Sequence, residues 1–357
     1  MNSKLVSIIA ISGFLSSSSA ALADKPPVGA KKRAPTIMQI AKSSKQWTGI
    51  TVSKTGRVFV CYPRWSDDVP VSVAELMPDG STRAFPDKKW NQYNKSKPAD
   101  CFVCVQSVFA DKDDNLWILD PAAPKFQGPV KDGAKLLKVD LTTGKVLSTF
   151  KFNNQICPKG SYLNDLRVDS ANNKIYITES GLGAIIVLDL KTSTSKRLLD
   201  KHPSTIAENI PVVINGKPWT KKVASDGIAF DGDYLYYKAL TGKSLYRVPA
   251  KELSLDDATN DSIAKVVEKI ADTCPSDGIE FGDDEDNLFI TSIEDNSIKR
   301  LNLKDKKMSV VVQDKNMIWP DTLSKAANGW MYVTSSQINL MPKPPSPYRV
   351  FKFKYSN

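Results

Sequence analysis

Histidine is almost absent from this chain of 357 residues, in which His202 is the only one. A single histidine excludes metal sites built from several imidazole groups. It also leaves any Ser-His-Asp triad dependent on one residue in a Lys-His-Pro-Ser loop. The glycines form neither a phosphate-binding loop nor a dinucleotide-binding fingerprint. Acid–base chemistry would therefore fall to aspartate, lysine or tyrosine.

Cysteine is scarce and odd in number, with Cys61, Cys101, Cys104, Cys157 and Cys274. An odd count leaves at least one thiol free or paired between chains, and spacing alone does not define a pairing. Cys101 and Cys104 have the spacing of a redox motif. However, they lead into a predicted strand and not into a helix N-terminus that would lower a thiol pKa. We therefore interpret the cysteines as structural or unpaired thiols.

Long apolar runs are missing, and the one short run lies at the N-terminus. Lys4, the apolar stretch 5–15 and the small residues Ala21 and Ala23 predict a signal peptide over residues 1–23, cleaved after about Ala23. Residues 24–35, rich in proline and lysine, are expected to form a flexible segment. No later stretch is apolar enough to cross a bilayer. We expect an exported protein, secreted or periplasmic, without an integral membrane segment.

Basic residues outnumber acidic ones, with 49 Lys and Arg against 39 Asp and Glu. No block of them is long enough to form a basic arm, so we interpret them as a solvated surface and expect no nucleic-acid partner. Electrostatic steering of an anionic partner, such as lipopolysaccharide or an acidic small molecule, is an alternative. We expect a monomer with a small-molecule ligand.

One pattern recurs six times along the chain. Each copy has a small or polar residue, a short apolar strand, a polar turn, and an aromatic residue about 11 positions after the start. The copies begin at Thr48, Gln106, Asp165, Asp226, Asp277 and Asp321, and their aromatic residues are Phe59, Trp117, Tyr176, Tyr236, Phe289 and Tyr332. Each copy therefore has the signature of a β-hairpin.

The spacing of the copies, about 44 to 61 residues, is typical of propeller blades. We predict an all-β fold, a six-bladed β-propeller formed as a single domain by residues 36–357. The sixth blade has only three strands of its own, so a strand over 36–41 is expected to complete it and close the ring. In the fourth blade the last strand is predicted over 263–270. The long connections at 87–104, 152–164, 200–225 and 335–347 are expected to include the walls of a binding site.

The leading residues of the six copies are the predicted site, because the first strand of each blade lines the central channel. Four carboxylates that converge there should raise one another's pKa unless a cation, a bound amine or a shared proton compensates. The alternative is structural, with these residues capping backbone groups of the neighbouring blade. We assign the candidate roles as catalytic for Asp226 and Asp277, ligand-binding for Thr48, Gln106, Asn164, Asp165 and Asp321, and metal-binding, for a calcium-like divalent cation, to Asn164, Asp226 and Asp277. No cofactor is required by the sequence.

Several motifs, in order from Trp47 to Gln337, resemble the yellow/major royal jelly protein family. They are the block from Trp47 to Trp65, Val105-Gln-Ser-Val108, Leu116-Trp-Ile-Leu-Asp120, Ser161-Tyr-Leu-Asn-Asp165, His202-Pro-Ser204 and Trp319-Pro-Asp-Thr-Leu323. The short chain and plain signal are more similar to bacterial members than to insect ones. The resemblance implies a secreted six-bladed propeller, and members that convert dopachrome, bind biogenic amines at the channel mouth, or serve as nutritive or structural proteins.

A more distant similarity is to the gluconolactonase/senescence-marker propellers, which hold a divalent metal on the axis through Glu, Asn and Asp. The position of their first-blade Glu corresponds to Thr48 here, which argues against a lactonase. Three functions stay open: a protein that binds or converts an amine- or quinone-like molecule, in the manner of a dopachrome tautomerase; a metal-dependent lactonase; and a non-catalytic secreted interaction protein. Arg64 and Trp65 are expected to pack at a blade edge.

Overall fold

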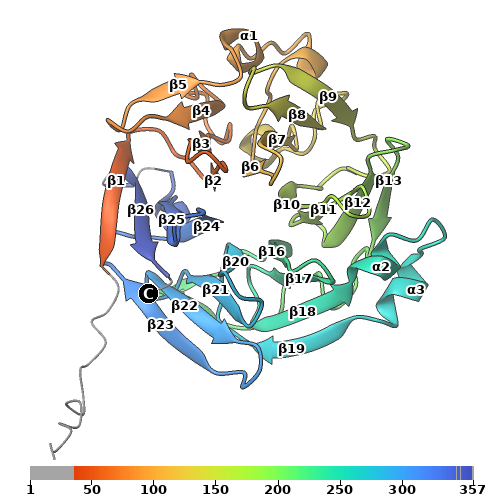
Figure 1. The fold of residues 1–357 in the computed structure, drawn as a ribbon, viewed down its shortest axis with the longest axis vertical. Helices are drawn as coiled ribbons and strands as arrows, with labels where there is room; N and C mark the ends of the chain where they lie inside the picture. Colours follow the sequence, from red (N-terminus) through yellow and green to blue (C-terminus); the bar gives the residue numbers. More distant parts are fainter. Residues whose placement is uncertain (1–35, 343, 346, 356–357) are drawn as a thin grey trace, which may run out of the picture. The chain divides into compact units, whose positions relative to one another are not determined.

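Six four-stranded antiparallel sheets surround a central axis in the computed structural model, which describes residues 36–342, 344–345 and 347–355 (Figure 1). Each sheet is one blade, with its first strand nearest the axis and its fourth strand at the rim. The predicted six-bladed β-propeller is confirmed. The predictions of a signal peptide over 1–23 and a flexible segment over 24–35 lie outside the described residues.

The strands of each blade follow one another from the axis outward. In blades one to three they are β2 (Ile50–Val52), β3 (Val58–Cys61), β4 (Val73–Leu76), β5 (Thr82–Ala84); β6 (Ser107–Ala110), β7 (Asn115–Asp120), β8 (Lys135–Asp140), β9 (Val146–Lys151); and β10 (Leu163–Asp169), β11 (Lys174–Glu179), β12 (Ala184–Asp189), β13 (Ser195–Leu198). In blades four to six they are β16 (Ser225–Phe230), β17 (Tyr234–Ala239), β18 (Ser244–Pro249), β19 (Glu268–Asp272); β20 (Ile279–Phe281), β21 (Asn287–Ser292), β22 (Ser297–Asn302), β23 (Met308–Gln313); and β24 (Pro320–Lys325), β25 (Trp330–Ser335), β26 (Tyr348–Lys354), β1 (Ile37–Ser43).

The N-terminal strand closes the ring as predicted. β1 pairs antiparallel with β26, from Ile37 opposite Phe353 to Ser43 opposite Tyr348. Trp47, fully buried just after β1, donates its indole N–H to the carbonyl of Arg349 at 3.2 Å. Because the first strand of the domain belongs to the last blade, the two ends of the ring are held together by backbone hydrogen bonds.

The repeated aromatic residues pack between neighbouring blades. Phe59, Trp117, Tyr176, Tyr236 and Phe289 are all buried, and Tyr332 is half-buried. Burial of each such side chain contributes about 1.5–3 kcal/mol relative to exposure. The hydrophobic clusters join adjacent blades, as where Trp117 of blade two packs with residues of blade three. This packing holds the inner strands, and the residues that precede them, at defined places around the axis.

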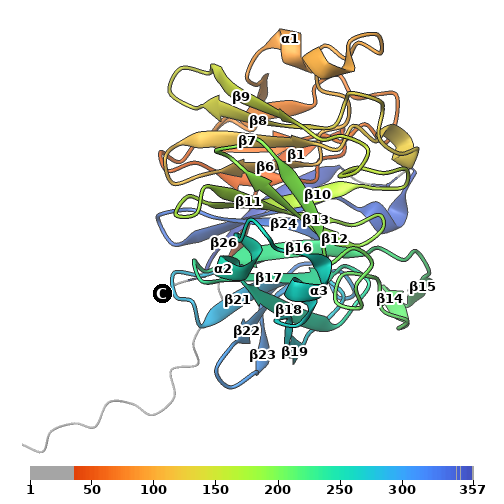
Figure 2. The same cartoon turned by 90° about the vertical axis from the view of Figure 1, so that its right-hand side faces the viewer.

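The fourth blade differs from the prediction in its last strand. The short helices α2 (Ala250–Leu253) and α3 (Asn260–Ala264) precede β19 and lie at the periphery of the ring (Figure 2). Thr259 and Ser262 cap each other at the start of α3, with side-chain to backbone hydrogen bonds of 3.1 and 3.0 Å. The strand predicted over 263–270 is therefore wrong at its start, where the capped helix takes the first residues.

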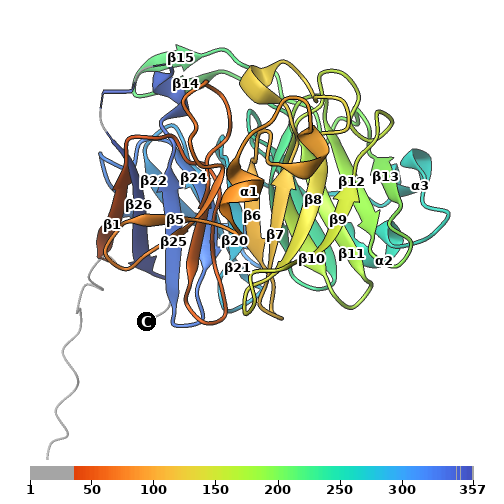
Figure 3. The same cartoon turned by 90° about the horizontal axis from the view of Figure 1, so that it is seen from above.

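The connection over 200–225 contains a hairpin that was not predicted. β14 (Val212–Ile214) and β15 (Lys217–Trp219) pair across Asn215 and Gly216, whose φ angles are 49° and 76°. Asn-Gly is the sequence signal for such a turn, so it could have been recognised. Figure 3 shows β14 and β15 beyond the ends of the blade strands on one side of the ring.

The other short elements in connections are α1 (Lys88–Asn91), η1 (Pro98–Asp100), η2 (Pro124–Phe126) and η3 (Ile338–Leu340). Within the described ranges, no helix has both the length and the apolar character of a membrane span.

Candidate functional site

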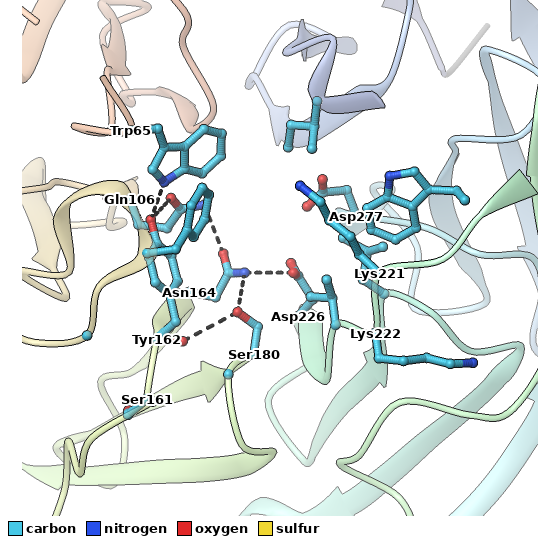
Figure 4. Close-up of a pocket in the computed structure, with 18 of the residues that line it drawn as sticks. Trp65, Gln106, Ser161, Tyr162, Asn164, Ser180, Lys221, Lys222, Asp226 and Asp277 are labelled. Atoms are coloured by element: carbon cyan, nitrogen blue, oxygen red, sulfur yellow. Dashed lines mark hydrogen bonds between the residues drawn. The ribbon is translucent and has the colours of Figure 1, made fainter. Parts of the chain in front are cut away.

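A cavity of about 550 Å³ opens at one mouth of the central channel (Figure 4). Its polar floor comes from the starts of four consecutive blades, with Gln106 just before β6, Asn164 in β10, Asp226 in β16 and Asp277 just before β20. All four side chains belong to residues that are at least nine-tenths buried. The structure thus brings together four of the residues predicted from the repeats.

A directed chain of hydrogen bonds crosses this floor (Figure 4). The indole N–H of Trp65 donates to the Tyr162 hydroxyl at 2.7 Å, and this hydroxyl donates to Oε1 of Gln106 at 2.9 Å. Nε2 of Gln106 donates to Oδ1 of Asn164 at 3.2 Å, and Nδ2 of Asn164 donates to Oδ2 of Asp226 at 2.6 Å. Every donor points toward Asp226, so the chain positions and polarises that carboxyl group.

Asp226 and Asp277 form an acidic dyad at the end of this chain. Burial and the charge of Asp277 raise the pKa of Asp226 well above its ordinary value. Burial raises the pKa of Asp277 to about 6, and the indole N–H of Trp319, which donates to Asp277 Oδ2 at 2.6 Å, limits that rise. The two carboxyl groups are close enough to hydrogen-bond when one is protonated. Asp226 therefore keeps its proton to higher pH than Asp277, and Asp277 is the member of the dyad that ionises first.

Other charges act on the dyad from outside the cavity. Asp165 and Asp321 lie near the dyad, and their negative charge, when they are ionised, contributes to the raised pKa of Asp226. Lys238, which is fully buried on β17, has the opposite effect, because its positive charge lowers the pKa of Asp277. Its ammonium donates to the carbonyls of Ala239 and Gly242 at 3.0 and 3.1 Å, and burial lowers its pKa to about 8.

Aromatic side chains form the cavity walls on both sides of the floor. On one side, Phe126 stacks on Trp65 with ring centres 5.0 Å apart and lies 5.7 Å from Tyr162. On the other side, Trp219 meets Trp319 edge-on at 5.0 Å. Such walls offer negative π faces above a negatively charged floor, an arrangement that attracts flat cations.

Most of these wall residues were missed in the sequence, and the expectation that Trp65 only packs at a blade edge is not met. Trp65 and Phe126 come from connections within blades one and two, which no motif marked as a binding loop. Among the predicted wall segments, 152–164 supplies Tyr162, 200–225 supplies Trp219 and 335–347 supplies Ile338. Arg64 packs as expected, because its guanidinium lies 4.5 Å from the Tyr93 ring centre and donates to backbone carbonyls. Only the folded chain shows which connections bend over the axis.

Three predicted ligand-binding residues do not line the cavity. Thr48 is fully buried and donates to the Gln106 carbonyl at 3.1 Å. Asp165 accepts a hydrogen bond from Ser107 of the preceding blade at 2.5 Å. Asp321 is 2% exposed, and its backbone carbonyl accepts from Gly278 N–H of the preceding blade at 3.0 Å. These contacts tie neighbouring blades together, which is the structural role considered for the whole set.

Asp226 and Asp277 differ from this pattern, because side chains of the cavity and not backbone amides donate to their carboxyl groups. The inter-blade contact at Asp226 is made by its carbonyl, which accepts from Thr178 Oγ1 at 2.7 Å. The hydrogen bonds from Asn164 and Trp319 also cross between blades, but both carboxyl groups line the cavity and remain available to a ligand.

The proposed metal ligands do not fit a divalent cation in this arrangement. Asn164 presents its Nδ2 to Asp226, while its oxygen accepts from Gln106. A hard cation requires several oxygen ligands directed at one point. In the described part of the chain, no three His, Cys, Asp or Glu side chains are grouped so that they could hold a metal ion.

Among the described residues, neither a cysteine nor a histidine lines the cavity. All five thiols are free and buried, and burial raises the pKa of Cys61, Cys104 and Cys157 to about 12. His202 lies 2.8 Å from Ser204, whose hydroxyl contacts the Tyr237 hydroxyl at 2.7 Å, and none of these residues lines the cavity. The cavity offers two carboxyl groups, the π faces of its walls, and two lysines in its lining, Lys221 and Lys222.

Comparison with known protein families identifies the family of this propeller. The model of the major royal jelly protein family matches residues 103–356. The chain therefore belongs to the major royal jelly protein family, as its motifs indicated. It is 25% identical over 209 residues to major royal jelly protein 7 of Apis mellifera, a match that spans 55% of this chain and 46% of that relative.

Solved structures of other propellers resemble this one in fold. A gluconolactonase from Xanthomonas campestris has a TM-score of 0.56 at 13% identity, covering 93% of this chain and 96% of its own. Regucalcin, a calcium-binding protein from Agrobacterium tumefaciens, has a TM-score of 0.55 at 14% identity. The match covers 88% of this chain and 95% of regucalcin. An inactive virginiamycin B lyase from Staphylococcus aureus has a TM-score of 0.54 at 14% identity. The match covers 90% of this chain and 99% of the lyase. At these identities the likeness concerns the fold alone.

Proposed function

We propose that this protein binds a flat, cationic, amine- or quinone-like small molecule in the axial cavity. The observation that carries the proposal is the placement of the acidic dyad, Asp226 and Asp277, between two aromatic walls. A cation held by desolvated aromatic faces gains about 0.5–2 kcal/mol from them. The negative dyad adds a charge-assisted hydrogen bond to the same ligand group.

The dyad also supports proton transfer on a bound quinone-like ligand. Ionised Asp277 accepts a proton from one position of the ligand, and protonated Asp226 donates its proton to another. The result is a tautomer of the starting compound, with protons balanced and no electrons exchanged. This chemistry is that of a dopachrome-type tautomerase, and it needs neither a nucleophile nor a cofactor.

The setting proposed for this activity is outside the cytoplasm, in a secreted or periplasmic monomer. The predicted signal peptide over residues 1–23 and the membership of the family support export. N-terminal sequencing of the protein recovered from its native compartment tests this, with Asp24 expected as the first residue. A chain that begins at Met1 there would contradict it.

A metal-dependent lactonase is less well supported. The likeness to gluconolactonase is one of fold, and the amide of Asn164 presents nitrogen where a metal would need oxygen. Hydrolysis of an aldonolactone that is lost on chelation would favour the lactonase. A non-catalytic interaction protein would show neither ligand binding nor turnover.

Calorimetric titration with tryptamine, a flat aromatic amine, tests the proposed binding. The wild type is compared with Asp226→Asn, Asp277→Asn and the double variant, and Asp257→Asn serves as an exposed control. We expect the double variant to lose at least about tenfold in affinity, since it removes the charge that pairs with the ammonium group. Thermal melts are run in parallel.

A folded double variant that binds tryptamine as tightly as the wild type would contradict the proposal. If the double variant does not fold, the two single variants decide the question, because each keeps one carboxyl group. The conversion is tested separately by following the loss of dopachrome absorbance. Unchanged rates in Asp277→Asn would exclude that residue as the base.

A further inference from the structure

The hairpin formed by β14 and β15 contributes its last residue, Trp219, to the cavity lining. Its backbone is tied to blade five, because Val213 N–H donates to Oε1 of Glu294 at 3.0 Å. Its last residue, Trp219, meets Trp319 edge-on, and Trp319 donates to Asp277. The residues that follow the hairpin are therefore held at the Asp277 side of the dyad.

Two lysines follow this hairpin in the cavity lining, and they differ in how they are used. Lys222 donates to the carbonyl of Glu208 at 2.8 Å, and its side chain extends away from the dyad (Figure 4). The side chain of Lys221 extends toward Asp277 (Figure 4). Within the described ranges, Lys221 makes no hydrogen bond or ion pair. It is thus a cation of the lining whose charge is not engaged by the protein.

Lys221 adds a positive charge to a cavity that also contains the acidic dyad, so the cavity mouth carries groups of both signs. A ligand that carries only an ammonium group is attracted by the dyad but repelled by Lys221. A ligand with an ammonium and a carboxylate on the same carbon satisfies both charges, because Asp277 and Lys221 both line this cavity.

We propose that Lys221 is a specificity-determining residue that selects aromatic ligands of the α-amino acid type over the corresponding decarboxylated amines. This inference rests on the proposed function, since it assumes that the amine binds at the dyad. Lys221 is exposed, so its pairing with a carboxylate is screened by water and salt. We expect an effect of about threefold to tenfold on affinity, the range of a single charge pair at a partly open site.

The test compares L-tryptophan with tryptamine, which differ only in the carboxylate. Both are titrated by calorimetry into the wild type, Lys221→Ala and Lys217→Ala. Lys217 is an exposed lysine of the same hairpin that does not line the cavity, so its variant removes the same charge from a nearby place. Thermal melts confirm that each variant is folded.

We expect the wild type to bind L-tryptophan more tightly than tryptamine. Lys221→Ala should lower the affinity for L-tryptophan by about threefold to tenfold and leave or increase that for tryptamine. Lys217→Ala should change neither. The preference for L-tryptophan should shrink as salt is added, because the added ions screen the exposed ammonium.

The other outcomes separate this inference from the proposed function. If tryptamine binds and L-tryptophan binds no better, or if Lys221→Ala changes both affinities equally or not at all, the role of Lys221 is overturned and the binding function stands. If neither compound binds the wild type, both proposals are overturned. An equal loss in Lys217→Ala would show a general effect of surface charge and would also overturn the specific role of Lys221.

Discussion

The side-chain amide of Asn164 donates a hydrogen bond of 2.6 Å to Oδ2 of Asp226, although the two residues lie 62 positions apart in the chain. The same nitrogen also donates to the Ser180 hydroxyl at 3.0 Å. Asn164 thus links blade three to the acidic dyad. Its amide N–H stabilises the carboxyl oxygen of Asp226 that accepts the hydrogen bond. This hydrogen bond to Asp226, and not the binding of a metal ion, is the role that the structure gives to Asn164 in the cavity floor.

Asn164→Ala should weaken binding of tryptamine by about tenfold, since the variant leaves buried Asp226 without its amide donor. The free energy of unfolding should fall by about 1–2 kcal/mol for the same reason. Calorimetry and denaturant unfolding measure the two effects. Asn154→Ala, at an exposed position outside the cavity, should change neither. An Asn164→Ala variant with wild-type affinity would remove Asn164 from the site.

Binding of tryptamine should depend on pH through the dyad. Asp277, with a pKa of about 6, is protonated below that pH, which makes the dyad neutral, whereas the ligand stays cationic. Affinity should therefore rise as pH increases through about 6 and level off above it. Titrations between pH 5 and pH 8, about one unit apart, measure the profile.

The same profile has two informative variants. Asp277→Asn should flatten it, because the titrating group is gone. Trp319→Phe should move its midpoint to higher pH, because the indole N–H that favours ionised Asp277 is lost while an aromatic wall is kept. A midpoint that stays in place in Trp319→Phe would show that another group controls the pH dependence.

Asp321 should make the protein less stable as pH rises. Burial and the charge of Asp277 raise the pKa of Asp321 well above its ordinary value, so the folded state keeps a proton that the unfolded state releases above about pH 4. The folded state then binds more protons, and stability falls with rising pH. Asp321→Asn removes this cost and should increase the free energy of unfolding by about 1–3 kcal/mol at pH 8.

The comparison with acid conditions makes this prediction specific. At pH 4, Asp321 is protonated in the folded state and about half protonated in the unfolded state, so Asp321→Asn should have only a small effect there. Asp257→Asn, at an exposed position, should have no effect at either pH. A stabilisation that is equal at pH 4 and pH 8 would mean that ionisation is not its cause.

Arg167 should stabilise the ring without contributing to the cavity. Its guanidinium donates to the carbonyl of Leu166 at 2.8 Å and, in blade five, to the carbonyl of Ile279 at 3.0 Å and the carboxylate of Glu280 at 3.1 Å. Arg167→Met should lower the free energy of unfolding by about 3 kcal/mol, since it breaks a largely buried ion pair.

The measurement is denaturant unfolding, with the exposed Arg300→Met as the control of matched chemistry. Affinity for tryptamine in folded Arg167→Met should remain that of the wild type, because Arg167 does not line the cavity. A lost affinity at unchanged stability would instead place Arg167 in the site.

Local patterns in the sequence determined much of the fold. Apolar strands separated by polar turns recur six times, and each copy predicts its own hairpin without reference to distant residues. The strand that completes the last blade was predictable because one blade lacked a strand and one strand near Ile37 lacked a partner. The end of blade four was not, because a helix cap at Thr259 outweighed the strand pattern after it.

The four aspartates show what only the tertiary structure decided. In the sequence Asp165, Asp226, Asp277 and Asp321 occupy the same place in their repeats. In the folded chain Asp165 binds a serine of the preceding blade and Asp321 lies outside the cavity lining, while Asp226 and Asp277 both line the cavity. The difference arises from residues far away in the sequence. The residue that donates to each carboxyl group, and the connection that bends over it, are set by how the blades pack around the axis, and no local pattern contains that information.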